Sequence, residues 1–328
     1  MFEQPKAMAP GMKRSALLAA LAAAPVALAT GRSPAVAQND AIHISGTAND
    51  SGATIFYAKD LELFPKAGLT DVTIDRLNSP GAAAAAVVGG TLTVGTLSMP
   101  SFVVAKAKGL PIVIIAPASL YNSAKPTTGI IVLQDSPIKT AADLNGKTLA
   151  TRDIENLSYY GTLDWVDKNG GDSKTLKWVE LDDPVIMTAM GSHHVDAGVV
   201  SEPVFDVALH SGARLLAACD DAIGEHFLIA CYFTTADYAL THPDIVRKIS
   251  QVIIEAGVWG NSHHAESASI LQKYAGAPVP ADITRVTYAE KMRAADVVPI
   301  LDLMQRYGIL KQPMNPTTLF APEVPLST

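Results

Sequence analysis

The sequence predicts an α/β fold in two lobes, each built on a doubly wound sheet, with a helical C-terminal third. Two observations predict it. Short apolar segments alternate with segments of helical pattern along most of the chain. The motif Gly-x-x-Ser-x-Pro-x-Phe also occurs twice, at Gly95–Phe102 and at Gly198–Phe205. The length of 328 residues is enough for about two domains.

The N-terminal part of the pattern alternates strands with helices. Because helices separate successive strands, this order predicts a parallel, doubly wound sheet. The expected strands are Ala41–Ser45, Val72–Asp75, Leu92–Val94 and Ile112–Ala116, and the expected helices are Thr54–Leu61, Gly81–Val88 and Phe102–Ala107.

A polar stretch, Tyr121–Thr127, interrupts the alternation, and a second series follows it. Its expected strands are Gly129–Leu133, Thr148–Thr151, Lys177–Leu181, Val195–Val199 and Ala213–Ala217, and its expected helices are Ala141–Leu144, Tyr159–Lys168, Pro184–Met190 and Val204–His210. We expect the chain to cross between lobes at Asn122–Lys125 and to return at Ala218–Gly224. Lobe I is then 38–123 plus 219–328, and lobe II is 124–218.

The C-terminal third is expected to be helical. Apolar residues from Ile245 to Trp259 fall on one helix face, and His242-Pro243 marks the start of that helix. A later helix is expected over Ala294–Tyr307, ending at Gly308.

Each copy of the repeated motif predicts a strand that ends at a Ser N-cap, with Pro in the first helical turn. Ser98 and Ser201 are the two caps. Helix N-termini at strand ends leave free N–H groups in the cleft of an open α/β sheet, so two such ends suggest two lobes gripping one small ligand. The alternative is that both are ordinary strand-to-helix turns.

The N-terminus has the pattern of an export signal. A basic Met12-Lys13-Arg14 precedes an Ala/Leu-rich segment, Ser15–Thr30, and Ala35-Val36-Ala37 fits a cleavage site. We therefore expect residues 1–37 to be a signal peptide, cleaved near Ala37, and the mature protein to be periplasmic. The net charge of −7 gives no support for nucleic-acid binding.

Cys219 and Cys231 are the only cysteines, and they flank a turn-rich stretch between two apolar runs. Since the export signal indicates an oxidising compartment, adjacent strands would allow a disulfide between them. The alternative is two small buried thiols. No third ligand at zinc spacing accompanies the His193-His194 or His263-His264 pairs, so no metal and no cofactor is expected.

The mature chain resembles the periplasmic substrate-binding proteins of ABC importers, in the nitrate/sulfonate/taurine branch. The segments that carry the resemblance are Phe56–Lys59, Leu63–Leu69, Gly81–Ala83, Gly90–Gly95, Lys106–Pro111, Ile138–Lys147, Gly191–Ala197, Glu202-Pro203, His242–Val246 and Tyr307–Leu310. Their order and spacing follow the family pattern. Two departures are the absence of an aromatic residue just before Glu202-Pro203 and Thr93 in place of the family's Asp.

The resemblance implies the type II fold of periplasmic binding proteins, with a ligand in the cleft, closure on binding and delivery to a permease in the inner membrane. The ligand implied is a small organic anion, sulfonate- or carboxylate-like, and the protein is expected to be a monomer. A sensor module is the first alternative. An enzyme on the same fold is the second, although the Cys-rich motif of the thiamine-pyrimidine relatives is absent.

The ligand of an open α/β sheet lies beyond the carboxyl ends of the strands, which selects the loops that follow them. Arg152 is a candidate for binding a carboxylate or sulfonate, or for pairing with Asp153, Glu155 or Glu202. Glu202 is a candidate for binding a ligand amine, or for stabilising a first helical turn. The ligand-binding candidates are Asn49, Ser51, Thr54, Ser79, Ser98, Met99, Tyr121, Asn122, Arg152, Ser158, Tyr159, Ser201 and Glu202.

Overall fold

A computed structural model describes residues 41–77, 79–275, 279–280 and 284–327. The expected signal peptide, 1–37, lies outside the described residues. The described residues form one compact unit, in which α-helices and β-strands alternate as the sequence predicts. The strands belong to four sheets rather than to one sheet in each predicted lobe.

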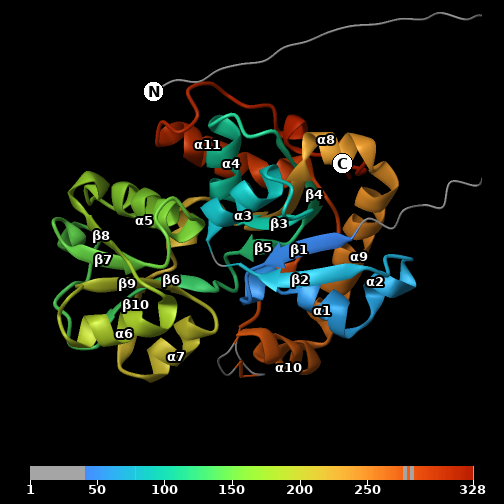
Figure 1. Cartoon of the computed structure of the whole chain (residues 1–328). Helices are drawn as coiled ribbons and strands as arrows, with labels where there is room; N and C mark the ends of the chain where they lie inside the picture. The colour runs from blue at the N-terminus through green and yellow to red at the C-terminus, as the bar shows by residue number, and fades with distance from the viewer. Residues whose placement is uncertain (1–40, 78, 276–278, 281–283, 328) are drawn as a thin grey trace, which may run out of the picture. The chain divides into compact units, whose positions relative to one another are not determined.

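One sheet has five strands in the order β10-β6-β9-β7-β8, and all five come from residues 128–217. Their bounds are β6 Thr128–Leu133, β7 Thr148–Thr151, β8 Lys177–Glu180, β9 Ala197–Ser201 and β10 Ala213–Ala217. Helix α5 (Leu157–Lys168) lies on one side of this sheet, and α6 (Asp183–Gly191) and α7 (Val204–His210) lie on the other (Figure 1). Beneath α6 and α7, Ile131, Ile186 and Phe205 belong to a separate buried cluster.

The other three sheets take their strands from the chain before and after that segment. Their orders are β3-β12-β4, β11-β5-β13 and β1-β2. The bounds are β1 Ile42–Gly46, β2 Val72–Arg76, β3 Gly95–Ser98, β4 Ile112–Pro117, β5 Ser119–Asn122, β11 His226–Leu228, β12 Ala230–Thr235 and β13 Thr287–Tyr288. The helices among them are α1 Thr54–Asp60, α2 Leu63–Lys66, α3 Pro80–Val88, α4 Met99–Ala107 and α8 Ala236–Thr241.

The expectation of purely parallel sheets is wrong. Strand β12 runs antiparallel to both β3 and β4, and β6 runs antiparallel to β9 and β10. Parallel neighbours need a crossover helix. Strand β6 instead follows β5 after a short turn, and β12 follows β11 after one residue, so both enter their sheets without such a helix.

The third strand lies at Gly95–Ser98, not at the expected Leu92–Val94. Val94 makes only an isolated bridge to Ile44, whereas β3 forms a ladder with β12. At Gly95 a side chain would collide with Phe233, since a Cβ there would lie 2.6 Å from the Phe233 ring. The absence of a side chain at Gly95 therefore lets the two strands meet.

The C-terminal third is helical, as expected. Helix α9 (Pro243–Ser262) packs its apolar face against α1 and β4, α10 (His264–Ala275) packs against α1, and α11 (Val298–Arg306) ends before Gly308. Among the described residues, no helix is long and apolar enough to span a membrane.

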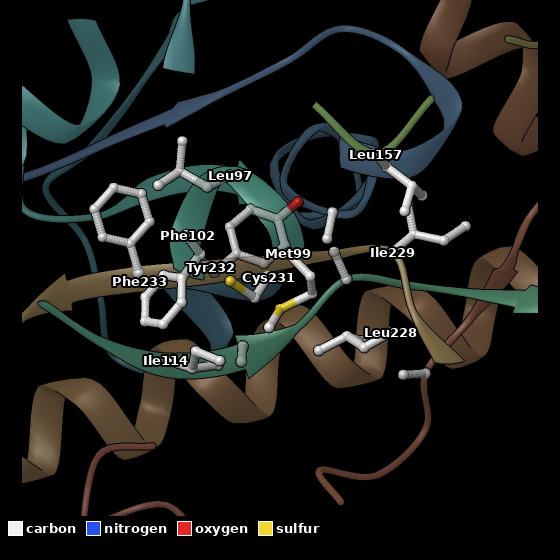
Figure 2. Packing of buried hydrophobic residues seen from close by; sticks show 14 of the residues in the cluster. Leu97, Met99, Phe102, Ile114, Leu157, Leu228, Ile229, Cys231, Tyr232 and Phe233 are labelled. Carbon is white, nitrogen blue, oxygen red and sulfur yellow. The ribbon is translucent and has the colours of Figure 1, made fainter. Parts of the chain in front are cut away.

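The two cysteines are both free and buried, so of the two alternatives the disulfide is not formed in this structure. Its premise of adjacent strands is wrong. Cys219 follows β10, at the edge of the five-stranded sheet, whereas Cys231 lies in β12, between β3 and β4. Figure 2 shows Cys231 packed among Met99, Phe102 and Tyr232. The alternative of two small buried thiols describes the structure.

Candidate functional site

A small pocket lies where residues of the five-stranded sheet and α5 meet residues of β3, β12 and the loop after β1. Its volume is about 90 Å³. Its lining residues are Thr47, Asn49, Ser51, Gly52, Leu77, Pro80, Thr96, Leu97, Ser98, Thr128, Arg152, Asp153, Asn156, Leu157, Ser158, Ser201, Ile229 and Ala230. Figure 2 shows two of them, Leu157 and Ile229, next to each other although they come from distant parts of the chain.

The loop after β1 forms one wall of the pocket. Asn49 closes a tight turn there, because its side-chain oxygen accepts a hydrogen bond from the Gly52 backbone N–H at 3.1 Å. The next residue, Asp50, points away from the pocket lining into the protein and is 3% exposed. Asn49 and Ser51 are thus held on the pocket side of a turn whose central carboxylate is anchored elsewhere.

That anchor is Arg285, which lies 235 positions later in the chain. The Arg285 Nε donates to Asp50 Oδ1 at 2.7 Å, and the backbone N–H of Val286 donates to Asp50 Oδ2 at 2.7 Å. Burial opposes the charge on Arg285, but the Asp50 carboxylate outweighs burial and raises the pKa of the guanidinium. A buried carboxylate left without such a partner would be strongly destabilising.

Two tyrosines complete this network. The Arg285 guanidinium donates to the Tyr57 hydroxyl at 2.7 Å, and the Tyr288 hydroxyl donates to the Asp50 carbonyl oxygen at 2.9 Å. Burial, followed by the Asp50 charge, raises the pKa of Tyr57 to about 12. Both hydroxyls therefore stay protonated at physiological pH, and the Tyr288 hydroxyl holds the pocket loop directly through Asp50.

Three helices begin at the pocket. Pro80 lies in the first turn of α3, Ser98 caps α4, and Asn156 caps α5. Ser98 Oγ accepts the Ser101 N–H at 3.3 Å, and Asn156 Oδ1 accepts the Tyr159 N–H at 2.9 Å. Since a helix N-terminus carries free N–H groups and about half a positive charge, all three favour an anion.

Arg152 is the one cationic side chain among the described residues that line the pocket. Its side chain is 32% exposed, and its Nη1 lies 3.9 Å from Asp183 Oδ2. Among the described residues, none of the three acidic partners considered from the sequence forms an ion pair with Arg152; these are Asp153, Glu155 and Glu202. A contact of 3.9 Å at the limit of an ion pair leaves most of the donors of the guanidinium available to a ligand.

Two carboxyl groups near Arg152 are shifted toward their neutral forms. Burial raises the pKa of Asp183, although Arg152 and the backbone N–H of Ser201 oppose the shift. Burial and then the Glu180 charge raise the pKa of Asp153, which lines the pocket itself. Burial therefore makes both carboxyl groups easier to protonate than an exposed Asp.

The second motif copy is built differently from the first. Ser201 lines the pocket, but it is not the cap of α7: that helix starts at Val204, and Pro203 occupies the cap position after a cis peptide bond. Glu202 Oε2 accepts the Asp206 N–H at 3.1 Å instead. The expectation of two matched Ser caps is correct only for Ser98.

Six of the predicted ligand-binding residues line the pocket: Asn49, Ser51, Ser98, Arg152, Ser158 and Ser201. Seven do not: Thr54, Ser79, Met99, Tyr121, Asn122, Tyr159 and Glu202. Thr54 is buried against the Tyr232 hydroxyl at 2.7 Å, Met99 is fully buried, and the Tyr121 hydroxyl donates to Asp221 at 2.7 Å.

The other four also have roles in the protein itself. Ser79 caps α3, and Asn122 accepts the Ala124 N–H at 3.0 Å. The Tyr159 ring packs on Trp178, with centroids 4.8 Å apart, and Glu202 is the acceptor for Asp206 described above. These side chains hydrogen-bond to nearby backbone groups or pack in the core. Such contacts cannot be predicted from the position of a loop in the sequence.

Several lining residues are absent from the sequence-based candidates. Thr96 and Leu97 lie within β3, Thr128 begins β6, and Ile229 and Ala230 lie at the junction of β11 and β12. The signal for Thr96 is its position two residues after the predicted strand Leu92–Val94. No local signal in the sequence identifies Ile229 or Ala230. They reach the pocket because β12 pairs antiparallel with β3 and β4.

The family model described as NMT1/THI5 like matches residues 49–261 of the sequence. The chain belongs to this family. The matched segment includes every lining residue of the pocket except Thr47. No curated protein matches the chain.

Solved structures share the fold at low sequence identity. The periplasmic aliphatic sulphonate binding protein SsuA from Escherichia coli matches with a TM-score of 0.71 at 18% identity, covering 86% of this chain and 98% of that one. The periplasmic nitrate-binding protein NrtA from Synechocystis PCC 6803 matches with a TM-score of 0.64 at 14% identity, covering 84% of each chain. The desulfurization enzyme DSZB matches with a TM-score of 0.62 at 14% identity, covering 86% of this chain and 96% of that one. The fold is therefore that of periplasmic binding proteins.

Proposed function

We propose that this protein is an extracytoplasmic solute-binding receptor for a small organic anion with a sulfonate or carboxylate group. The observation that carries the proposal is the meeting of Arg152 with the N-termini of α3, α4 and α5 around one pocket. A chain of net charge −7 offers no global attraction to an anion, so local dipoles and one guanidinium must hold it.

Hydroxyl groups complete the proposed anion site. Ser51, Ser98, Thr128, Ser158 and Ser201 all line the pocket. A hydroxyl donates one hydrogen bond and rotates freely to do so, which suits the several oxygens of a sulfonate or carboxylate. Each hydrogen bond to a charged group contributes about 1.5–3 kcal/mol.

We propose that the receptor is exported to the periplasm as a monomer and delivers its ligand to an ABC permease in the inner membrane. The export signal predicted at residues 1–37 supports this placement, as do the names of SsuA and NrtA, which are both periplasmic binding proteins. A permease as the partner is implied by the resemblance of the sequence to the binding proteins of ABC importers.

We propose that the ligand closes lobe I, 38–123 plus 219–328, onto lobe II, 124–218. Two observations support hinges at 122–125 and 218–224. The five-stranded sheet takes all its strands from 128–217, and the two crossings run side by side: β5 pairs with β11, and Tyr121 donates to Asp221. Small-angle scattering with and without saturating ethanesulfonate should show compaction. An unchanged radius of gyration would contradict closure by this probe.

Binding is tested on the mature chain after unfolding and refolding have removed any co-purified ligand. We expect ethanesulfonate or propionate at 100 times its Kd to stabilise the protein by about 2.7 kcal/mol. Arg152→Ala should weaken binding about ten- to a hundred-fold, because a charged group loses its partner. Arg247→Ala removes an equal charge from the exposed side of α9, away from the pocket, and serves as the matched control. The proposal fails if no organic anion stabilises the wild type.

An enzyme on the same fold is the competing function, favoured by the match to DSZB. The refolded protein used in the binding test also serves to distinguish a receptor from an enzyme. A receptor returns ethanesulfonate unchanged after prolonged incubation, as measured by mass spectrometry. Sulfite release or any other conversion that depends on Arg152 would show an enzyme instead.

A further inference from the structure

A second cavity adjoins the anion pocket and is of a different chemical character. Its volume is about 280 Å³, and Pro80, Leu97 and Asp153 line both cavities. Its remaining lining residues are Gly81, Ala84, Ala85, Ser101, Val104, Ala105, Lys108, Leu110, Ile154 and Glu155. Most of these are apolar, in contrast to the hydroxyl-rich first pocket.

The room in this cavity comes from small residues on two facing helices. Ala84 on α3 and Ala105 on α4 are both buried, with 6% and 9% exposure, and both line the cavity. Larger aliphatic side chains at these two positions would occupy it. The Ala-rich sequence of α3 therefore leaves apolar space directly beside the start of the same helix, where Pro80 contacts the anion pocket.

Three charged side chains line the cavity: Asp153 lies where it meets the anion pocket, and Lys108 and Glu155 form an ion pair. Lys108 Nζ lies 3.5 Å from Glu155, and their side chains are 65% and 48% exposed, so this pair lies at the solvent boundary. It joins the end of α4 to the loop that follows Arg152. The Lys108–Glu155 pair thus lies at the solvent side of the cavity, Asp153 lies on the side of the anion pocket, and most of the remaining lining is apolar.

The first pocket alone is small for an organic ligand. Ligand pockets are usually about 300–1,000 Å³, whereas this one is about 90 Å³, which is suitable for a head group. The adjoining cavity of about 280 Å³ shares three lining residues with it. An anion held at Arg152 would extend its non-ionic end past Leu97 and Pro80 into that space.

We propose that this cavity is a subsite for the apolar tail of the ligand, so that the receptor selects amphiphilic organic anions over compact inorganic or fully polar ones. The proposal rests on the anion-receptor function above. The tail lies between α3 and α4 on one side and residues 153–155 on the other. Apolar surface removed from water there strengthens binding with each added methylene.

A chain-length series tests the subsite. Calorimetric titration compares ethane-, butane-, hexane- and octanesulfonate, and the matching carboxylates, on the refolded protein. Each methylene that leaves water should lower Kd by up to about fourfold until the cavity is full. Octanesulfonate should therefore bind at least about tenfold more tightly than ethanesulfonate.

Variants that fill the cavity should remove this chain-length selectivity. Ala84→Leu places bulk at a buried lining position, and Ala85→Leu does so at an exposed lining position, where folding is less at risk. The measured quantity is the ratio of the ethanesulfonate Kd to the octanesulfonate Kd, which should fall toward one. Ala82→Leu lies on the same helix, is exposed, and lines neither cavity, so the ratio should stay at the wild-type value.

The outcomes separate the two proposals. If ethanesulfonate and octanesulfonate bind the wild type equally, the tail subsite is wrong and the anion pocket stands. If the selectivity is present but survives both filling variants, the tail lies elsewhere and this assignment is overturned. If no sulfonate or carboxylate of any length binds, the receptor function and the subsite both fail.

Discussion

The two copies of Gly-x-x-Ser-x-Pro-x-Phe share four residues but are built in different ways. In the first, Ser98 ends β3 and caps α4, with its Oγ accepting the Ser101 N–H. In the second, Ser201 ends β9 but leaves the capping of α7 to Glu202, whose carboxylate accepts the Asp206 N–H. Both serines nevertheless line one pocket.

The difference follows from the residue that stands between Ser and Pro. Met99 is apolar and fully buried, so it provides no hydrogen-bond acceptor, and Ser98 must cap the helix. Glu202 places a longer side chain with two acceptors at the equivalent position. That frees Ser201, whose Oγ accepts only a long hydrogen bond, 3.4 Å, from Thr128 Oγ1. Both copies of the motif thus place a serine at the pocket, but the serine caps a helix only in the first copy.

The largest change in unfolding free energy is expected at Glu202, the residue that caps α7 in the second copy. Glu202 is buried, and burial raises its pKa to about 7 from an ordinary 4.5. The folded state therefore holds the proton more tightly than the unfolded state, and stability is lost as the pH rises from about 4.5 to about 7. Glu202→Gln keeps an acceptor for Asp206 but does not ionise. It should be more stable than the wild type by up to about 3 kcal/mol at pH 8, and nearly equal to it at pH 4.5.

Urea unfolding at pH 4.5 and pH 8 measures this difference. Glu255→Gln, on the exposed side of α9, removes one negative charge without touching a cap and serves as the control. If Glu202→Gln and the wild type lose stability equally between the two pH values, Glu202 is not a buried, partly protonated cap.

The sequence predicts the order of elements well, because periodicity and capping are local. Helix α7 and strand β10 have the predicted bounds, and α9 begins at Pro243 as expected. Strand direction is not local. The antiparallel entry of β12 between β3 and β4 depends on pairing across more than 100 residues, and the shift of the third strand to Gly95–Ser98 follows from that pairing.

The lining of the pocket is predictable where a loop is short and follows a strand end, as at Asn49, Ser98 and Arg152. It is not predictable where the candidate side chain has a closer partner inside the protein, as Tyr121 does in Asp221. The anchoring of Asp50 by Arg285 also escapes prediction. Its two partners lie 235 positions apart, and a charged pair buried this deeply has no local pattern.

A smaller effect is expected at the first copy. Ser98→Ala removes the cap of α4 and should cost about 1 kcal/mol of unfolding free energy, together with about tenfold or more in ethanesulfonate affinity. Ser98→Asp separates the two roles, since Asp is an equally good cap but places a negative charge in the proposed anion pocket. It should retain the stability and lose the binding. Equal binding by Ser98→Asp and wild type would exclude Ser98 from the anion site.

The smallest effect on stability is expected at the second copy. Ser201→Ala removes one hydroxyl that accepts a 3.4 Å bond from Thr128 and caps nothing, so the unfolding free energy should change by less than about 0.5 kcal/mol. The backbone N–H of Ser201, which donates to Asp183, is retained in the variant. Because Ser201 lines the pocket beside Arg152, ethanesulfonate affinity should still fall about tenfold. Urea unfolding and calorimetric titration of Ser98→Ala and Ser201→Ala in parallel measure both quantities. If Ser201→Ala destabilises the protein as much as Ser98→Ala, the two copies are equivalent caps after all. If it changes neither stability nor binding, the second serine has no part in the site.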